Sequence, residues 1–303
     1  MKIMRFHSAD GFRLGVQTGD ALVDLSEIRS DAPRDLADLL KMGPDILAEV
    51  KAAARAAGWV QMKPLEQARV ALPMANPSKF ICLGLNYQDH VAESKNARPQ
   101  YPTLFLRVPT SLVAHGDPIE RPQASIQLDY EAELAVVIGR SLRNARAEEA
   151  LSAVAGFACF NDGSVREFQR HTIQWTMGKN FDRTGGFGPF FVSADELPAG
   201  AAGLKISTRV NGETRQSDNT ANMIFNVGET LSYISRGITL GPGDVIAMGT
   251  PAGVAHAHTP PKWLCDGDIV EVEIEGIGTL RNPVVDEVRP SGHKRAPDTK
   301  VPA

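Results

Sequence analysis

Short β-branched runs bounded by turn residues fill the chain from about residue 79 onward. Gly, Pro, Asn and Asp separate these runs, which is the pattern of strands joined by turns. Asn211-Gly212 between two of them is a hairpin signal. VGETLSYISRG is the clearest helix in this part of the chain. We therefore expect a mixed, β-rich fold. The runs are KFICLGL, TLFLRV, EAELAVVIG, VAGFACF, LKISTRV, DVIAMG and IVEVEIEG.

The first seventy residues have a different organisation. KIMRFH, FRLGVQ and ALVDL are strand-like, and two helices follow, the first capped by Ser30 or Asp31 and the second opening at Pro44. The stretch ALPMANPSK then has the composition of a linker. The predicted organisation is a small α+β domain over residues 1–72, a β-rich catalytic domain over 73–288, and a disordered tail over 289–303, where Pro, Lys and Ser lack periodicity.

Composition limits the possible functions. The 303 residues are 43% hydrophobic, enough for a sizeable core, and the net charge is −4 with no basic face, so we expect no nucleic-acid partner. No apolar run reaches about 18 residues and no signal-peptide pattern is present, so we expect a cytoplasmic protein without a membrane span. The three cysteines are far apart, as in buried thiols of a reducing compartment.

The stretch LDYEAELAVVIGR sets Asp129, Glu131 and Glu133 at alternate positions before an apolar run. In a strand these three side chains share one face, where their like charges repel unless they stay in water or meet a positive charge. A solvated strand face is one interpretation. A hard divalent cation bound by carboxylate oxygens is another. Paired glycosidase carboxylates fit less well, because those flank a sugar from opposite sides.

Two further stretches favour a site. In GFACFNDGSVREFQ, Asp162 follows a β run, where a turn can direct its carboxylate across a sheet. In WTMGKNFDRTGGFGPFFV, Lys179 lies in a Gly-rich loop before another strand. Either residue alone is more typical of a turn former or a surface charge.

With these residues the chain resembles the fumarylacetoacetate hydrolase (FAH) family. That resemblance implies an FAH-type β-sandwich or β-roll catalytic domain, a small N-terminal domain, a homodimer, and Mg²⁺ or Mn²⁺, with Ca²⁺ possible, held by Glu131, Glu133 and Asp162. Asp129 falls outside this triad, as a supporting or solvated group. The matching motifs are GLNYQDHVAES, PTLFLRVPTSLVAHGDPI, DYEAELAVVIG, NDGSVREFQ, GKNFD with GFGPF, GDVIAMGTPAGV and GIGTLRNPV.

The family motif N-Y-x-x-H-x-x-E is present as Asn86, Tyr87, His90 and Glu93. If a short helix begins here, His90 and Glu93 lie three residues apart on one face, and the carboxylate can orient the imidazole as a general base. The segment could order over substrate as a lid. The alternative is an exposed histidine in a polar loop.

Other roles carry over from the resemblance. Gln169 and Lys179 would contact the reacting oxygens, while Tyr87, Arg107 and Thr250 would bind substrate. Arg107 stands where many relatives have lysine, and its guanidinium could pair with a substrate carboxylate, or it could be an outward-facing strand arginine. Gly163 replaces a β-branched residue, which we expect to loosen the turn after Asp162.

The resemblance implies a metal-dependent hydrolase that cleaves a C–C bond of a 1,3-diketo acid, such as an acylpyruvate or fumarylpyruvate, in catabolism of aromatic or sugar-acid compounds. A decarboxylase, isomerase or hydratase acting on a 2-oxo or 2-hydroxydienoic acid is equally compatible with enolate chemistry. A non-enzymatic β-domain that binds a metal or small acid is a third class, although it leaves His90 and Glu93 without a task. A Rossmann enzyme and a serine hydrolase are disfavoured, since G-x-G-x-x-G and G-x-S-x-G are absent.

Overall fold

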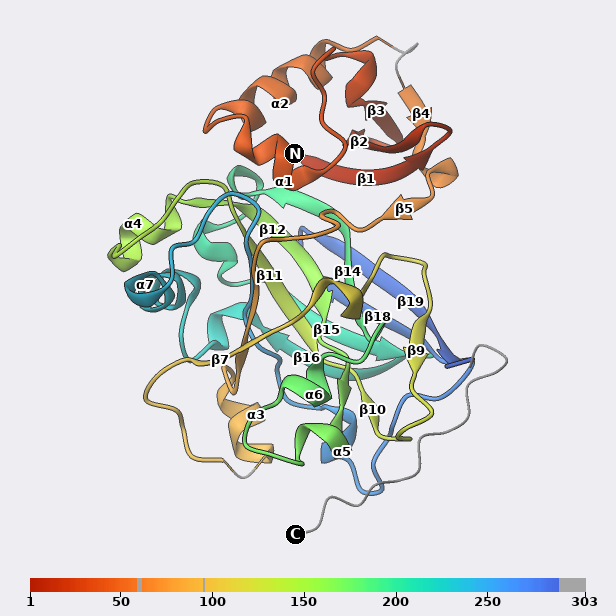
Figure 1. The fold of residues 1–303 in the computed structure, drawn as a ribbon, viewed down its shortest axis with the longest axis vertical. Helices are drawn as coiled ribbons and strands as arrows, with labels where there is room; N and C mark the ends of the chain where they lie inside the picture. Colours follow the sequence, from red (N-terminus) through yellow and green to blue (C-terminus); the bar gives the residue numbers. More distant parts are fainter. Residues whose placement is uncertain (59–61, 95, 289–303) are drawn as a thin grey trace.

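The computed structural model describes residues 1–58, 62–94 and 96–288, and its strands form three β-sheets (Figure 1). The tail predicted over 289–303 lies outside the described residues. The strands are β1 (Lys2–Ser8), β2 (Gly11–Thr18), β3 (Ala21–Asp24), β4 (Met62–Pro64), β5 (Val70–Ala71), β6 (Phe80–Gly84), β7 (Thr103–Leu106), β8 (Leu112–Val113), β9 (Ile119–Arg121), β10 (Leu128–Asp129), β11 (Ala132–Ile138), β12 (Val154–Asn161), β13 (Ser164–Val165), β14 (Gly185–Ser193), β15 (Lys205–Val210), β16 (Glu213–Asn219), β17 (Val245–Ala247), β18 (Ile269–Ile274) and β19 (Gly278–Asp286). The helices are α1 (Leu36–Lys41), α2 (Ile46–Ala56), α3 (Gln88–Glu93), α4 (Ala147–Leu151), α5 (Arg166–Gln169), α6 (Thr176–Lys179) and α7 (Val227–Gly237).

The largest sheet has twelve strands, and its main path runs β4-β3-β2-β1-β14-β12-β11-β17-β6-β7. The N-terminal strands join it through β1, where Lys2 lies opposite Val192 of β14. The N-terminal segment therefore extends the central sheet, with its two helices at one end of the molecule (Figure 1). Strands from both sides of residue 72 belong to one continuous sheet, so the sheet itself does not mark a boundary there. The domain boundary stays a prediction.

The predicted cap of the first helix is wrong. Helix α1 begins at Leu36, and its cap is Asp35, whose side chain accepts a hydrogen bond from Ala37 N at 2.9 Å. The other oxygen of Asp35 accepts from Ala75 N at 2.9 Å, so the cap also holds the segment that leaves the N-terminal part. Ser30 and Asp31 lie before the helix and do not cap it.

A second sheet of five strands, in the order β16-β15-β18-β19-β9, packs against the central sheet, so the catalytic part is a β-sandwich. Strand β11 is buried on both faces. Its Leu134 and Val136 belong to the core between the two sheets, whereas Ala135 and Val137 belong to the core shared with α1 and α2. Burying each Val or Leu side chain contributes roughly 1.5–3 kcal/mol to folding. The buried strand β11 therefore fixes the position of the residues that directly precede it.

Local predictions in the β-rich part are confirmed. Asn211 and Gly212 have φ of 53° and 80°, the left-handed values that a type I′ turn requires, and they join β15 to β16. Helix α7 spans VGETLSYISRG, and Asn226 with Glu229 forms its capping box. Within the described ranges, no helix is both long and apolar enough to cross a bilayer.

Candidate active site

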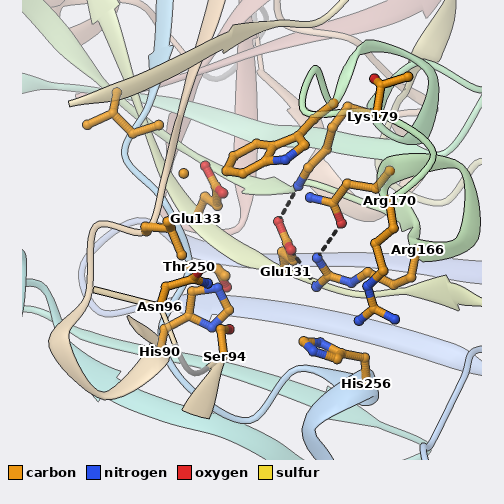
Figure 2. Close-up of a pocket in the computed structure, with 16 residues that line it drawn as sticks. His90, Ser94, Asn96, Glu131, Glu133, Arg166, Arg170, Lys179, Thr250 and His256 are labelled. Carbon is orange, nitrogen blue, oxygen red and sulfur yellow. Dashed lines mark hydrogen bonds and ion pairs between the residues drawn. The ribbon is translucent and has the colours of Figure 1, made fainter. Parts of the chain in front are cut away.

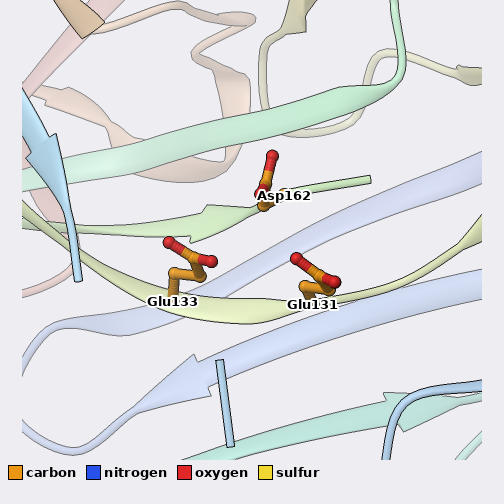
Figure 3. Close-up of side chains that lie close together, drawn as sticks. All are labelled: Glu131, Glu133 and Asp162. Carbon is orange, nitrogen blue, oxygen red and sulfur yellow. The ribbon is translucent and has the colours of Figure 1, made fainter. Parts of the chain in front are cut away.

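Three buried carboxylates meet where β11 begins and β12 ends. Glu131 and Glu133 project from one strand, and Asp162 lies above them on the neighbouring strand (Figure 3). The strand register brings them together, because Asp162 N donates to Glu131 O at 2.9 Å directly after the pair Ala132–Asn161. One oxygen of each residue lies within 4.8 Å of the others, and all three side chains are at most 5% exposed.

Cations from distant segments neutralise part of this cluster. Lys179 Nζ, at the end of α6, lies 2.6 Å from Glu131 Oε2 and 2.5 Å from Asp162 Oδ2. Arg107 Nη1 lies 2.5 Å from Asp162 Oδ1. Although burial opposes ionisation of Glu131, Arg166 and Lys179 hold its pKa at about 2. Glu131 is therefore an anion at neutral pH.

Glu133 has no cation of its own among the described residues. Its Oε2 accepts a hydrogen bond from Gly249 N at 3.0 Å. Burial, followed by the charges of Asp162 and Glu131, raises the pKa of Glu133 well above its ordinary value. The three carboxylates, of which Glu133 resists ionisation, fit a hard divalent cation. Mg²⁺ and Mn²⁺ favour oxygen donors and would supply the missing positive charge. The donor set thus suits the predicted metal.

Asp129 is buried, so it is not the solvated group that the sequence allowed. Its Oδ2 accepts from Arg166 Nε at 2.8 Å, and its Oδ1 accepts from Ala255 N at 2.7 Å. Arg166 also lies 2.5 Å from Glu131 Oε1. Asp129 therefore links the start of α5 to the segment after Thr250, and supports Arg166 beside the carboxylate cluster.

His90 and Glu93 form a hydrogen-bonded pair on α3. His90 Nδ1 lies 2.8 Å from Glu93 Oε1, as the three-residue spacing predicts, and His90 is only 7% exposed. Glu93 Oε2 accepts from Gly253 N at 2.9 Å, which attaches α3 to the GTPAGV segment. Asn86 anchors the start of the helix, donating to Met248 O at 2.7 Å. His90 therefore lies on a short helix that lines the pocket, not in an exposed polar loop.

One cavity of about 380 Å³ is lined by members of both groups, Glu131 and Glu133 of the triad and His90 of the pair (Figure 2). Leu83, Leu85 and Trp175 supply apolar wall. The predicted residues His90, Glu131, Glu133, Gln169, Lys179 and Thr250 line it, and so do Ser94, Asn96, Arg166, Arg170, Thr172 and His256. A cavity of this size accommodates a small organic acid.

Thr250 and Gln169 are held by neighbours on the pocket wall. Thr250 Oγ1 accepts from Gln216 Nε2 at 2.8 Å, and Gln169 Oε1 accepts from Arg166 Nη1 at 2.9 Å. Lys179 was expected in a loop but ends the short helix α6.

Tyr87 and Arg107 are not on the pocket wall. Tyr87 is fully buried and its hydroxyl has no hydrogen-bond partner in the described structure. The Arg107 side chain is also inaccessible and donates to Asp162, Ser111 and Thr184. The guanidinium donates to five oxygens in all, those of Asp162, Gly163, Thr184 and Ser111, the last through both its hydroxyl and its carbonyl. It therefore orients the Asp162 carboxylate, and its expected role as a substrate clamp is corrected.

Gly163 does not loosen the turn after Asp162. A Cβ on Gly163 would lie 1.9 Å from the carbonyl oxygen of Thr184, so only glycine fits this close approach. The Gly163 carbonyl also accepts from Arg107 Nη1 at 3.0 Å. The turn is thus packed against its neighbours.

Arg166, Arg170, Trp175 and His256 were missed as pocket residues. Arg166 lies inside the motif NDGSVREFQ, so its position was a usable signal, whereas His256 follows GTPAGV without any pattern of its own. Only the fold brings α5 and the 255–257 turn to the same cavity.

Residues 79–285 match the family model described as Fumarylacetoacetate (FAA) hydrolase C-terminal. The chain belongs to the fumarylacetoacetate hydrolase family. It is 36% identical to "Oxaloacetate tautomerase fahd2, mitochondrial" of Xenopus laevis over 94% of this chain and 90% of that protein. The recognised family and the β-rich fold are both confirmed.

Solved FAH-family structures share the fold but carry different activities in their names. A 5-carboxymethyl-2-hydroxymuconate delta-isomerase from Mycobacterium smegmatis superposes with a TM-score of 0.74 at 30% identity, covering 95% of this chain and 100% of that one. Maleylpyruvate hydrolase from Sphingobium sp. SYK-6, in complex with manganese (II) and pyruvate, has a TM-score of 0.78 at 27% identity, covering 94% and 99%. Similar chains therefore include a tautomerase, an isomerase and a hydrolase, and one of them binds a divalent cation.

Proposed function

We propose that this protein is a divalent-cation-dependent enzyme that moves a proton at the carbon next to the carbonyl of a 2-oxo acid, with keto–enol tautomerisation of an oxaloacetate-like acid as its reaction. The observation that carries the proposal is one cavity lined by Glu131 and Glu133 of the carboxylate triad and by His90 of the His90–Glu93 pair. The similarity to an oxaloacetate tautomerase over nearly the whole chain favours this substrate.

Glu131, Glu133 and Asp162 would hold the cation, which we take to be Mg²⁺ or Mn²⁺, with Ca²⁺ as a possible alternative. When bound, it would polarise the carbonyl of a 2-oxo acid and stabilise the negative charge that develops on that oxygen. Lys179 and Gln169 face the same space and would donate hydrogen bonds to the developing charge.

His90 is the proposed base. Glu93 occupies Nδ1, which leaves Nε2 as the nitrogen available to the pocket. Nε2 would take the proton from the carbon beside the carbonyl, the C–C bond would gain double-bond character, and the carbonyl oxygen would gain the electron pair. Glu93 would stabilise the imidazolium until the proton is returned, to the oxygen for the enol or to carbon for the keto form. Helix α3, attached through Glu93 to Gly253, would limit water access.

Hydrolysis of an acylpyruvate C–C bond is the second candidate. It is favoured by the similarity to a maleylpyruvate hydrolase captured with manganese and pyruvate. For that reaction His90 would deprotonate a water molecule that adds to the distal carbonyl. The C–C bond would then break, its electron pair would pass to the pyruvate half as an enolate, and the proton held by His90 would be returned to the enolate carbon. The two candidates share the same residues and differ in the group that His90 deprotonates, a substrate carbon or a water molecule. A cytoplasmic homodimer, predicted from the sequence, stays a prediction.

One screen separates these functions. The purified protein is mixed with Mg²⁺ or Mn²⁺ and with oxaloacetate, acetylpyruvate, fumarylpyruvate or a 2-hydroxydienoate, while enol or diketone absorbance and product are followed. We expect the oxaloacetate keto–enol interconversion to accelerate, and the acceleration to vanish with chelator and return with metal. Cleavage of acylpyruvates without tautomerisation would favour the second candidate. Metal binding without turnover of any of these acids would favour the non-enzymatic alternative.

A further inference from the structure

The outer part of the cavity contains basic side chains that the proposed chemistry does not use. Arg170 follows α5, and His256 lies in the 3-10 turn Ala255–Ala257. Both line the cavity on the side away from Glu133 (Figure 2). They are close enough for the Arg170 charge to act on the imidazole: burial, together with Arg166 and Arg170, lowers the pKa of His256.

Neither side chain is committed to another protein group. Among the described residues, the Arg170 guanidinium forms no ion pair or hydrogen bond, whereas Arg166 beside it is paired with Asp129, Glu131 and Gln169. His256 Nδ1 is buried and has no hydrogen-bond partner. An unpaired buried polar group is costly, so His256 Nδ1 is suited to an external acceptor. The exposed Arg170 guanidinium adds an unpaired positive charge on the same cavity wall.

The positions of these side chains are set by the interior. Asp129 is fully buried and accepts hydrogen bonds from Arg166 Nε at 2.8 Å, from Ala255 N at 2.7 Å and from His256 N at 3.2 Å. One carboxylate therefore joins the two segments that carry Arg170 and His256. The fold therefore fixes the backbone from which both basic side chains extend, while the Arg170 side chain itself is exposed.

Charge balance separates this region from the inner end. The inner end holds four buried carboxylates against three buried cations. A bound dication would leave one net positive charge there, which the carboxylate of a 2-oxo acid would balance. Among the described residues that line the cavity, Arg170 is the remaining arginine or lysine, and a second carboxylate on the substrate would pair with it. The inner carboxylates are Asp129, Glu131, Glu133 and Asp162, and the inner cations are Arg107, Arg166 and Lys179.

We propose that Arg170 and His256 form a second anion subsite that recognises the distal carboxylate of a 2-oxo dicarboxylic acid. This inference rests on the proposed function for the inner end of the cavity. Arg170 contributes the charge, and neutral His256 contributes a hydrogen bond from its ring N–H. Leu83, Leu85 and Trp175 form the apolar part of the cavity wall. The substrate class is therefore a diacid.

The test compares two acids that differ only at the far end. 2-Oxoglutarate and 2-oxovalerate have the same number of carbons, and a carboxylate in the first replaces a methyl group in the second. Their affinities are measured by calorimetry with the full chain in saturating Mg²⁺. We expect wild type to bind 2-oxoglutarate about tenfold more tightly, at the weaker end of charge-assisted hydrogen bonds because Arg170 is exposed. The preference should diminish as NaCl is raised.

Variants identify the residues responsible. Arg170→Gln should lose most of the preference by weakening 2-oxoglutarate alone, Arg170→Lys should retain part of it, and His256→Phe should reduce it while keeping a ring in place. Arg236→Gln, at an exposed arginine of α7, is the matched control and should bind both acids as wild type does. In turnover of oxaloacetate, Arg170→Gln should raise KM about tenfold with kcat nearly unchanged.

The outcomes distinguish this inference from the proposed function. If no 2-oxo acid is turned over but the preference exists in wild type and is lost in Arg170→Gln, the subsite stands and the proposed reaction fails. If oxaloacetate is turned over and Arg170→Gln binds both acids as wild type does, or weakens both equally, the subsite is overturned and the reaction stands. Equal affinity of wild type for the two acids also overturns it.

Discussion

Replacing Lys179 with methionine tests whether the carboxylate cluster depends on positive charge. The ammonium group lies 2.6 Å from Glu131 and 2.5 Å from Asp162, and its side chain is 2% exposed. Removing one partner of a buried ion pair destabilises a protein by about 3–5 kcal/mol, because it leaves a buried charge without compensation. Lys179→Met should therefore lower the free energy of unfolding by about that amount in chelator.

The corresponding shift in melting temperature follows from chain length. An unfolding entropy of about 2.1 cal/mol/K per residue gives about 0.64 kcal/mol/K for this chain, or about 1.6 °C per kcal/mol. Lys179→Met should thus melt about 5–8 °C below wild type when metal is removed. Adding Mg²⁺ should raise Tm more in the variant than in wild type, because the dication also replaces the lost charge.

Lys51 offers a matched control, because it also pairs with two carboxylates at similar distances, but at the solvent-exposed surface. Its Nζ lies 2.5 Å from Asp195 and 2.6 Å from Glu196, but those carboxylates are 58% and 42% exposed. An exposed pair contributes about 0–1 kcal/mol, so Lys51→Met should shift Tm by less than about 2 °C, with no metal dependence. Differential scanning calorimetry of wild type and both variants, with EDTA and with Mg²⁺, gives the Tm shift of each variant under each condition. Equal shifts for Lys179→Met and Lys51→Met would refute the reasoning.

Three further predictions concern the same cavity. Asp162→Asn should fold but lose metal-dependent turnover and the rise of Tm with Mg²⁺; full activity in this variant would exclude Asp162 as a ligand. His90→Ala should lower kcat by roughly 10² to 10⁴ with little change in metal affinity, Glu93→Gln should cost less because the imidazole remains, and an undiminished kcat would remove the pair from the mechanism. Because the pKa of Glu133 is raised in the folded state, the metal-free protein should lose stability as the pH rises above the ordinary glutamate range toward that raised pKa. Over the same rise in pH, Mg²⁺ should bind more tightly, and its binding should release a proton. Calorimetry in buffers of different ionisation enthalpy counts that proton, and none released at neutral pH would contradict a protonated Glu133.

Short-range rules indicated a cluster of carboxylates, whereas the grouping of these three residues as metal ligands came from the family resemblance. Alternation along one strand places Glu131 and Glu133 on one face, and a carboxylate directly after a neighbouring antiparallel strand falls opposite the start of the first. The His90–Glu93 contact was likewise predictable, since residues three apart on a helix are neighbours. These features need only secondary structure and the pairing of two strands.

The corrected roles depend on long-range packing. Burial of Tyr87 and Arg107 is decided by segments far away in the chain, such as Thr184 behind Arg107, and no local pattern encodes it. His256 reaches the cavity because its backbone is bound to Asp129, which is 127 positions earlier. Side chains of the same type can face a pocket or an interior, and composition does not distinguish the two.

The alternating carboxylates of LDYEAELAVVIGR are tolerated because most of their charge is compensated. Asp129 pairs with Arg166 and accepts from three backbone N–H groups, Glu131 lies between Arg166 and Lys179, and Glu133 has, among the described residues, the N–H of Gly249 and no cation. Positive charge is therefore present beside Asp129 and Glu131 and lacking beside Glu133. A cation that binds this row would gain most at Glu133, where compensation is weakest, while Asp129 stays engaged with the outer segments of the cavity. The same row of like charges thus serves both ends of the pocket, and its repulsion is greatest where a dication would be most strongly bound.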